Sequence, residues 1–248
     1  MDQTSGIAGF LAQTDAVGRT LALVLLAMSI VTWYLIITKA TQVLAARRRS
    51  ARFLDLFWNS TSLGAVATQL EGDHPNEPFS HLTHHGIVAA RHHRLHGANK
   101  LDQAGNGADF LTRAMRRVID EETACLESGL TVLASIGSTA PFVGLFGTVW
   151  GVYHALVAIG ASGQGTLDKV AGPVGEALIM TAFGLAVAIP AVLGYNAFVR
   201  SNRLTLGKLD SFAHDLFSFL TTGSHVSTPV QDPAAVMPLR PAAASRGN

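Results

Sequence analysis

Residues 173–199 read PVGEALIMTAFGLAVAIPAVLGYNAFV, and this stretch decides how the chain folds. It is longer than the ~20 apolar residues that an α-helix needs to cross a bilayer. Glu176 is its only charged residue. A carboxylate in a membrane span is costly, and it usually faces a bundle interior or an aqueous cavity, where it serves proton or ion traffic. The alternative is a carboxylate near the outer interface that only hydrogen-bonds a neighbour, because Glu176 lies about one helical turn inside the apolar run.

The composition of the whole chain is that of a membrane protein. Charged residues make up 14% and hydrophobic residues 48% of the sequence, whereas ~25% of residues are charged in ordinary soluble domains. The net charge is only +1, so we expect no nucleic-acid partner. Asp2 stands where a signal peptide has its basic start, and we expect no cleavable signal peptide.

Two further stretches, residues 20–38 and residues 129–159, are also long and apolar enough to cross a membrane. Together with residues 173–199 they predict an all-α integral membrane protein with three transmembrane helices. Lipids are therefore expected partners along all three spans.

The distribution of cations predicts how these spans are oriented. Residues 1–19 and residues 160–172 carry only Arg19 and Lys169 as cations, whereas arginines and lysines concentrate at the other end of each span. The positive-inside rule therefore makes the first segment a periplasmic N-terminus and the second a periplasmic loop. The C-terminus is predicted to lie in the cytoplasm.

Residues 39–128 are predicted to form a cytoplasmic helical region. We expect one helix to continue inward from the first span to about Leu70, and another to run from Asp109 into the second span without a break. Residues 200–222 are predicted to continue the third span as a cytoplasmic helix, and residues 223–248, rich in Ala, Pro and Ser, to be a disordered tail. The second and third spans are thus expected to extend as long helices into a cytoplasmic helical stalk. Its segments are too thinly apolar for a large core of their own, which favours packing against other copies in a homo-oligomeric ring.

Small residues recur at helical spacing along the second and third spans. Gly144 and Gly151 lie on one face of the second span, and Ala177 and Gly184 lie on one face of the third. Small residues allow helix backbones to approach closely in lipid. We assign these four positions to helix packing.

Two threonines belong to the same stripes. Thr148 lies roughly 16 Å, and Thr181 roughly 12 Å, from the outer end of its span at 1.5 Å per residue. Both depths fall near the middle of a ~30 Å hydrocarbon core, with Glu176 closer to the outer end. These three residues are predicted to form a polar path through an apolar bundle. The alternative is that each threonine hydrogen-bonds only to carbonyl groups of its own helix.

Six histidines crowd one cytoplasmic stretch: His81, His84, His85, His92, His93 and His96. Two pairs have the i,i+4 spacing that can bind a metal. No cysteine accompanies them, and a zinc site would need a fixed third ligand. A solvated, basic helix face is the favoured interpretation, and a metal-dependent membrane enzyme is the alternative. We expect no metal and no catalytic residue.

Two motifs carry a family resemblance. STAPFVGLFGTVWGVYHAL at residues 138–156 and GPVGEALIMTAFGLAVAIPAVLGYN at residues 172–196 resemble the signature of the ExbB/TolQ/MotA proton-channel family. Within that family, VTWYLIITK at residues 31–39 is more similar to the ExbB branch than to the TolQ branch. The resemblance covers roughly residues 16–222 and is most specific in the second and third spans.

The resemblance implies a non-enzymatic energy converter in the inner membrane of a Gram-negative bacterium. Members of the ExbB branch form a homopentamer around a dimer of ExbD transmembrane helices. They use the proton-motive force to energise TonB, which drives import of siderophores and vitamin B12 through outer-membrane receptors. The family's polar membrane residues correspond to Thr148, Glu176 and Thr181. Protons are the coupling ion, and no other cofactor is expected. A TolQ-like role in the Tol-Pal envelope system and a passive membrane scaffold are the alternatives.

Overall fold

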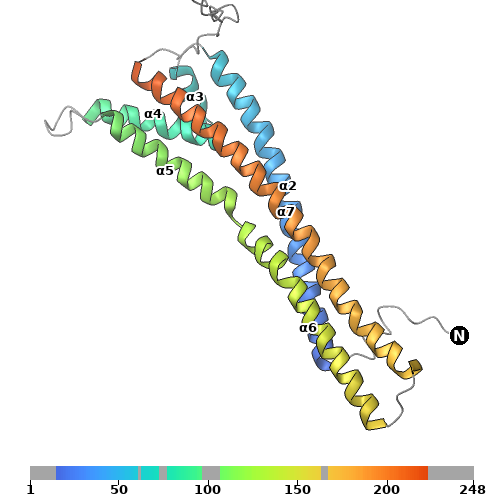
Figure 1. The fold of residues 1–248 in the computed structure, drawn as a ribbon. Coiled ribbons are helices and arrows are strands. Elements are labelled where there is room, and N and C mark those ends of the chain that lie inside the picture. The colour runs from blue at the N-terminus through green and yellow to red at the C-terminus, as the bar shows by residue number, and fades with distance from the viewer. Residues whose placement is uncertain (1–14, 61–62, 73–76, 97–106, 163–166, 223–248) are drawn as a thin grey trace, which may run out of the picture.

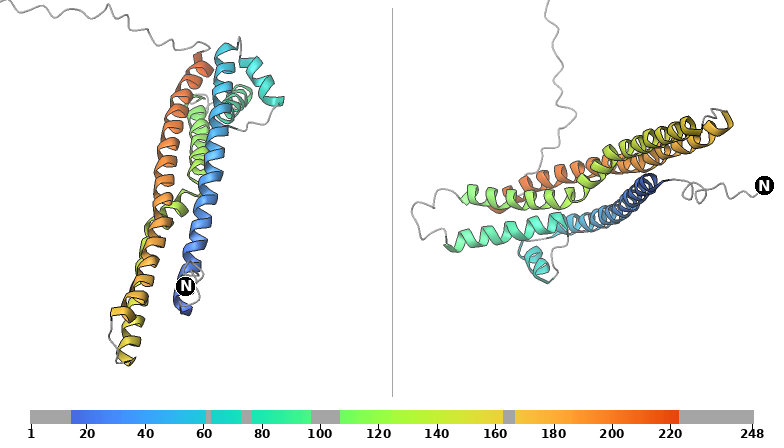
Figure 2. Two further views of the ribbon diagram at one scale, coloured as in Figure 1. Left: turned by 90° about the vertical axis from the view of Figure 1, so that its right-hand side faces the viewer. Right: turned by 90° about the horizontal axis from the view of Figure 1, so that it is seen from below.

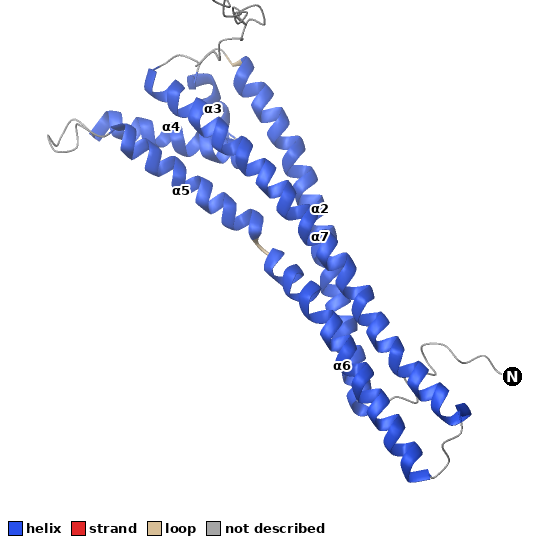
Figure 3. Ribbon diagram, in the orientation of Figure 1, coloured by secondary structure: helices blue, strands red, loops and turns tan. Residues whose placement is uncertain are grey.

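The computed structural model describes residues 15–60, 63–72, 77–96, 107–162 and 167–222, and every regular element within these ranges is an α-helix (Figure 3). The predicted tail, residues 223–248, lies outside the described residues. The helices, in chain order, are α2 (Ala16–Asn59), α3 (Leu63–Gly72), α4 (Pro78–His96), α5 (Gly107–Glu127), α6 (Leu130–Ser162) and α7 (Leu167–Thr222).

The long helices form an elongated bundle. Helices α2, α6 and α7 run side by side along one half, whereas α3, α4 and α5 gather around the far ends of α2 and α7 (Figures 1 and 2). Three helical stretches are long and apolar enough to cross a membrane: Ala16–Asn59, Gly107–Ala161 and Ala177–Thr222. The prediction of an all-α chain with three candidate membrane spans is confirmed. The membrane boundaries within these helices stay predictions.

The helix that follows the first span is shorter than predicted. α2 ends at Asn59, and Ser60 is extended, with φ −76° and ψ 136°. The Asn59 side chain donates to the carbonyl oxygen of Asp55 at 2.8 Å, and the Ser60 hydroxyl donates to that of Leu56 at 2.7 Å. Such short polar side chains compete for backbone groups and end helices. The prediction of one helix to about Leu70 is therefore wrong, because α3 is a separate element.

The predicted unbroken helix from Asp109 through the second span is also wrong. The helix is interrupted at Gly129, whose φ is +78°. Residues with a side chain rarely adopt this left-handed conformation, which commonly ends a helix at glycine. α5 consequently leans away from the direction of α6 (Figure 1).

Helix extends into both ends of residues 160–172, whose periplasmic placement stays a prediction. α6 continues to Ser162 and α7 begins at Leu167, so helix occupies both ends of the predicted loop. α7 is a single helix from there to Thr222, which includes the predicted cytoplasmic extension, residues 200–222.

The described residues build two hydrophobic clusters. One joins α2, α6 and α7 in the half that carries the predicted spans, with Leu133 and Ala191 fully buried. The other joins α2, α3, α4, α5 and α7 at the far end, where the ring of Phe212 packs edge-on against Phe57 and Phe79, with centroids 5.1 Å and 5.5 Å away. The expectation that the stalk has too few apolar residues for its own core is therefore wrong. Each helix contributes few apolar side chains, but five helices pool them.

Candidate functional site

The predicted packing stripes of α6 and α7 meet in the structure. A Cβ added to Gly144 would lie 2.7 Å from the carbonyl oxygen of Met180 and 3.0 Å from the Cα of Gly184. A Cβ added to Gly184 would lie 2.7 Å from the carbonyl oxygen of Ala140. These distances are shorter than real contacts, so the two backbones approach as closely as they do because neither residue has a side chain.

The same face continues toward the predicted periplasmic end. Gly151 packs on Ala177, where an added Cβ would lie 2.9 Å from the Cβ of Ala177. Sequence reasoning missed Gly147, which accommodates Met180, with the side chain of Met180 3.1 Å from the position of an added Cβ. Gly147 is three residues from Gly144 and four from Gly151, the spacing of a single helix face, so helical periodicity could have identified it.

The two predicted threonines touch across this interface. The hydroxyl oxygens of Thr148 on α6 and Thr181 on α7 are 2.5 Å apart. Thr148 Oγ1 also lies 3.1 Å from the carbonyl oxygen of Ala177 and 3.2 Å from that of Gly144, in its own helix. The pair thus combines the predicted contact between helices with the alternative, back-bonding within one helix.

The number of protons limits how these hydroxyls can be arranged. Each threonine hydroxyl has one proton to donate and two lone pairs to accept with. One arrangement satisfies the contacts with both the carbonyl oxygens and the second hydroxyl: Thr148 donates to Ala177 or Gly144, and Thr181 donates to Thr148. In this arrangement no described residue donates to Thr181 Oγ1. A protonated carboxyl group that approaches α7 beside Thr181 can donate a hydrogen bond to Thr181 Oγ1.

Glu176 lies in α7, directly before Ala177, which faces Gly151. Its side chain is outside the part of the chain that the structure describes. Along the helix axis, residue 176 is ~7.5 Å from residue 181, because five residues separate them at 1.5 Å each. The backbone therefore brings Glu176 within two turns of the hydroxyl pair, on the side predicted to face the periplasm.

Comparison with known proteins identifies the family. The family model described as the MotA/TolQ/ExbB proton channel family matches residues 77–210, which include Thr148, Glu176 and Thr181. The chain belongs to this family. The resemblance drawn from the two sequence motifs is thereby confirmed.

Individual relatives agree with this assignment. The biopolymer transport protein ExbB of Xanthomonas campestris is 42% identical over 213 residues, which cover 85% of this chain and 84% of the relative. The ExbB of Neisseria meningitidis is 42% identical over 192 residues, 77% of this chain and 86% of the relative. The Tol-Pal system protein TolQ of Pseudomonas aeruginosa is 32% identical over 228 residues, 92% of this chain and 97% of the relative. Identity to these two ExbB proteins is thus higher than identity to this TolQ.

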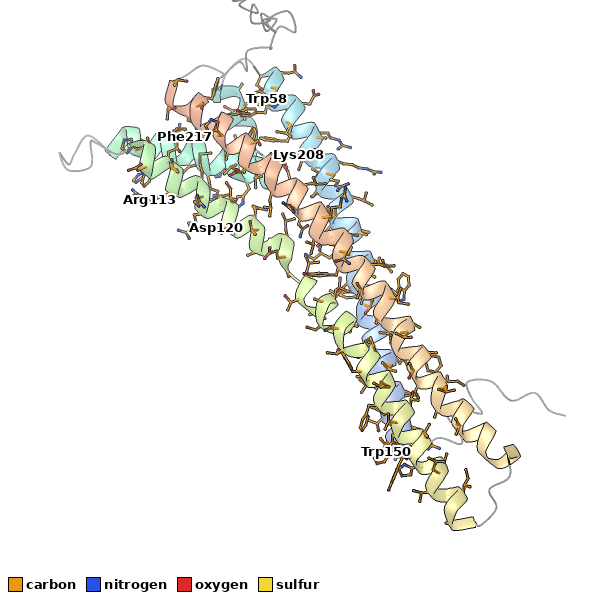
Figure 4. All side chains as sticks on the ribbon, in the orientation of Figure 1. Trp58, Arg113, Asp120, Trp150, Lys208 and Phe217 are labelled. Carbon is orange, nitrogen blue, oxygen red and sulfur yellow. The ribbon has the colours of Figure 1, made fainter. Side chains whose placement is uncertain are left out.

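A contact that sequence reasoning missed ties the start of α2 to α6. Asp15 caps α2 by accepting from the backbone N–H of Gly18 at 2.9 Å, and it also accepts from Trp150 Nε1 at 2.7 Å. These hydrogen bonds, the one from Gly18 first, lower the pKa of the Asp15 carboxyl. Trp150 follows Thr148 by two residues and lies toward the end of α6 that is remote from α5 (Figure 4). The tie joins residues 135 positions apart, so no local pattern indicates it.

Among the histidines whose side chains the structure describes, His81 contacts α5, whereas His85 and His92 are exposed, so this helix face is only partly solvated. His81 Nδ1 lies 2.6 Å from Glu122 Oε1, which links α4 to α5. His85 packs edge-on against His81, with ring centroids 4.7 Å apart, and partial burial, followed by the neighbouring His81, lowers the pKa of His85. Among the described residues, no three His, Cys, Asp or Glu side chains are grouped so as to hold a metal ion.

The glycine contacts predict a matched pair of substitutions. Gly184→Ala should force α6 and α7 apart, because its Cβ would meet backbone atoms of Ala140 and Gly144; overpacking of this kind costs ~1–3 kcal/mol. Gly207→Ala, in the same helix, meets nothing within 4 Å and should raise stability slightly, because alanine suits a helix interior better than glycine. Thermal unfolding of the two purified variants in detergent measures the difference. Equal melting temperatures would contradict the close approach.

Proposed function

We propose that this chain is the proton-channel and stator subunit of an inner-membrane motor of the ExbB–ExbD–TonB type. In this role it uses the proton-motive force to energise TonB-dependent import of siderophores and vitamin B12 across the outer membrane. The observation that carries the proposal is the Thr148–Thr181 hydroxyl pair, which lies between two closely packed apolar helices. Membership of a proton channel family supports the choice of ion.

The geometry supports a simple division of roles. Thr181 accepts a hydrogen bond from a protonated carboxyl group that a partner helix brings into the membrane. Thr148 orients Thr181 by accepting a hydrogen bond from its hydroxyl. Thr148 is oriented in turn by the hydrogen bond that it donates to the carbonyl oxygen of Ala177 or Gly144. Glu176, nearer the predicted periplasmic side, serves as the relay or polar contact from which the proton arrives. Proton transfer is the only chemical step in this mechanism, and no covalent intermediate forms on the chain.

The partner of this path is an ExbD dimer enclosed by a ring of five copies of this chain, and the complex acts on TonB. Exposed apolar side chains on α6 and α7 support contacts beyond the single chain, with other copies or with lipid; they include Phe142, Leu145, Val149, Leu178, Leu185 and Ile189. The inner membrane holds the ring with its N-terminus in the periplasm and its C-terminus in the cytoplasm. The cation distribution supports this orientation. In it, α4, α5 and the far halves of α2 and α7 form the cytoplasmic stalk.

The driving force is sufficient for such a device. A membrane potential supplies ~2.3 kcal/mol for each charge that crosses 100 mV. One proton therefore outweighs an interhelical hydrogen bond in lipid, which averages ~0.6 kcal/mol. The hydrogen bond between a partner's carboxyl group and Thr181 can accordingly form and break during each transfer.

Complementation tests the proposal against a TolQ-like role, for which the 32% identity to a TolQ protein is the specific observation. The chain is expressed with its own ExbD-type partner in two Gram-negative strains, one lacking ExbB and TolQ together and one lacking only TolQ. The proposal expects restored growth on a siderophore as the only iron source in the first strain. Rescue only of envelope integrity, measured as detergent resistance in the second strain, would replace it with the TolQ-like role.

A further inference from the structure

Two side chains from other helices hold the last carbonyl groups of α5. Lys39 of α2 donates from Nζ to the carbonyl oxygens of Cys125 and Leu126, each at 3.3 Å. Asn202 of α7 donates from Nδ2 to the same Leu126 oxygen at 2.8 Å. The last carbonyl groups of a helix have no partner inside it and form the negative end of its dipole. An ammonium group and an amide N–H are therefore suitable partners for them.

These contacts surround the break between α5 and α6. Gly129, with its φ of +78°, is two residues beyond the end of α5. The position that a Cβ would take at Gly129 is 3.3 Å from Leu35 and 3.9 Å from the side chain of Lys39. Asn202 is only 6% exposed, so its amide group is largely shielded from water. Four helices thus meet at one joint, which lies where the predicted spans end: Lys39 is the first cation after residues 20–38.

We infer that Lys39 and Asn202 are positioning residues that clamp the end of α5 to α2 and α7. The left-handed Gly129 interrupts the regular helical hydrogen-bond pattern, so α6 alone does not fix the direction of α5. The clamp replaces this lost connection with three hydrogen bonds from neighbouring helices. α5 therefore follows α2 and α7, the two helices that continue from the predicted membrane into the far half of the bundle.

The consequence for activity rests on the proposed function. A stator must stay rigid while the enclosed partner moves. If the joint at Gly129 were flexible, the far half of the bundle would move with the partner, and less of the energy would reach that partner. Loss of the clamp should then lower energy conversion without changing the hydroxyl pair, which lies on α6 and α7 well away from the joint. The hydrogen bonds of Lys39 and Asn202 described above go to the end of α5 and not to Thr148 or Thr181.

Hydrogen exchange of the full-length complex in lipid nanodiscs tests the clamp without reference to activity. Lys39→Met and Asn202→Leu keep side-chain size but remove the donors. In the double variant, peptides that span Gly129 should exchange roughly tenfold faster, as expected for a local opening, whereas peptides around Thr148 should not change. Lys39→Arg keeps the cation and should exchange like the wild type. Lys208→Met removes an exposed cation farther along α7 (Figure 4) and is the matched control. Unchanged exchange in the double variant would overturn the clamp.

Transport in cells tests the consequence separately. The double variant should support siderophore-dependent growth several-fold more slowly than the wild type, while Lys39→Arg and Lys208→Met stay near wild-type rates. Faster exchange with undiminished growth would overturn the role in energy conversion. If Asn202→Leu prevents assembly, Lys39→Met alone carries both measurements, since Lys39 is only partly buried. A wild-type chain that supports no growth would refute the proposed function, and the exchange measurement would still decide the clamp.

Discussion

Replacement of Glu176 by alanine is expected to abolish siderophore-dependent growth while the protein still inserts and assembles. Glu176 is the only charged residue in residues 173–199, so no other group in that span can take its place in proton transfer. Removal of a proton-transfer group typically lowers a rate by roughly 100-fold or more. Stability should not fall, because a carboxylate within a span is itself unfavourable by up to ~3.5 kcal/mol.

Two further variants separate proton transfer from packing at this position. Glu176→Gln keeps the shape and hydrogen-bonding capacity but cannot ionise, and it should be as inactive as alanine. Glu176→Asp keeps the ionisable group and should retain part of the activity. Native mass spectrometry is expected to show five copies of the chain in every variant. Full activity of Glu176→Gln would favour a passive scaffold, and loss of the assembled complex would assign Glu176 a structural role.

The parts of the fold that the sequence predicted are those that depend on local composition. A membrane span is recognised from one continuous apolar run, and all three runs lie within helices long enough to cross a bilayer. The contact between Thr148 and Thr181 was open to prediction for a similar reason. Helical periodicity places each threonine on the small-residue face of its span, and similar depths from the same membrane surface bring them close to one level.

The breaks in the helices depended on information that is not local. Gly129 is one of many glycines in the chain, and most of those in α6 and α7 lie inside regular helix. What distinguishes it is the clamp: Lys39 is 87 residues from Leu126 in sequence, and Asn202 is 76 residues from it. The Asp15–Trp150 tie was inaccessible for the same reason.

The second core was missed because its apolar residues are spread over five helices. α4 illustrates the difficulty, because its sequence mixes histidines with a few apolar residues. Leu82 is nevertheless fully buried, and Glu77, itself 8% exposed, accepts from the Ser50 hydroxyl of α2 at 2.6 Å. The Glu77 side chain also accepts from the backbone N–H groups of Phe79 and Ser80, so it links α2 to the start of α4. Composition averaged over α4 conceals this arrangement.

Removal of the hydroxyl pair is expected to stop energy conversion almost completely. Valine is close to threonine in size but has no hydroxyl, so Thr148→Val and Thr181→Val test polarity with little change in shape. Each variant should weaken siderophore-dependent growth, and the double variant should nearly abolish it. Assembly should persist, because interhelical hydrogen bonds in lipid average only ~0.6 kcal/mol.

The arrangement of the protons makes the two single variants unequal in stability. Thr148→Val removes the acceptor of Thr181 and leaves a partly buried hydroxyl without a partner, which costs about 1–3 kcal/mol. Thr181→Val leaves Thr148 bonded to the carbonyl of Ala177 or Gly144 and should cost less. Thr181→Val nevertheless removes the hydroxyl that accepts from the partner's carboxyl group in the proposed path, so it should impair growth more than its small effect on the melting temperature accounts for.

Serine at the same positions decides between hydroxyl chemistry and packing. Thr148→Ser and Thr181→Ser keep the hydroxyl but lose a methyl group, so they fill the interface less well than valine does. If the hydroxyls form the proton path, serine variants should support growth at most of the wild-type rate although they pack worse. Growth rate on siderophore-bound iron, measured beside the yield of purified complex with its ExbD-type partner, separates the two effects. Valine variants that grow as well as serine variants would reduce Thr148 and Thr181 to packing residues and remove the main structural support for the proposed path.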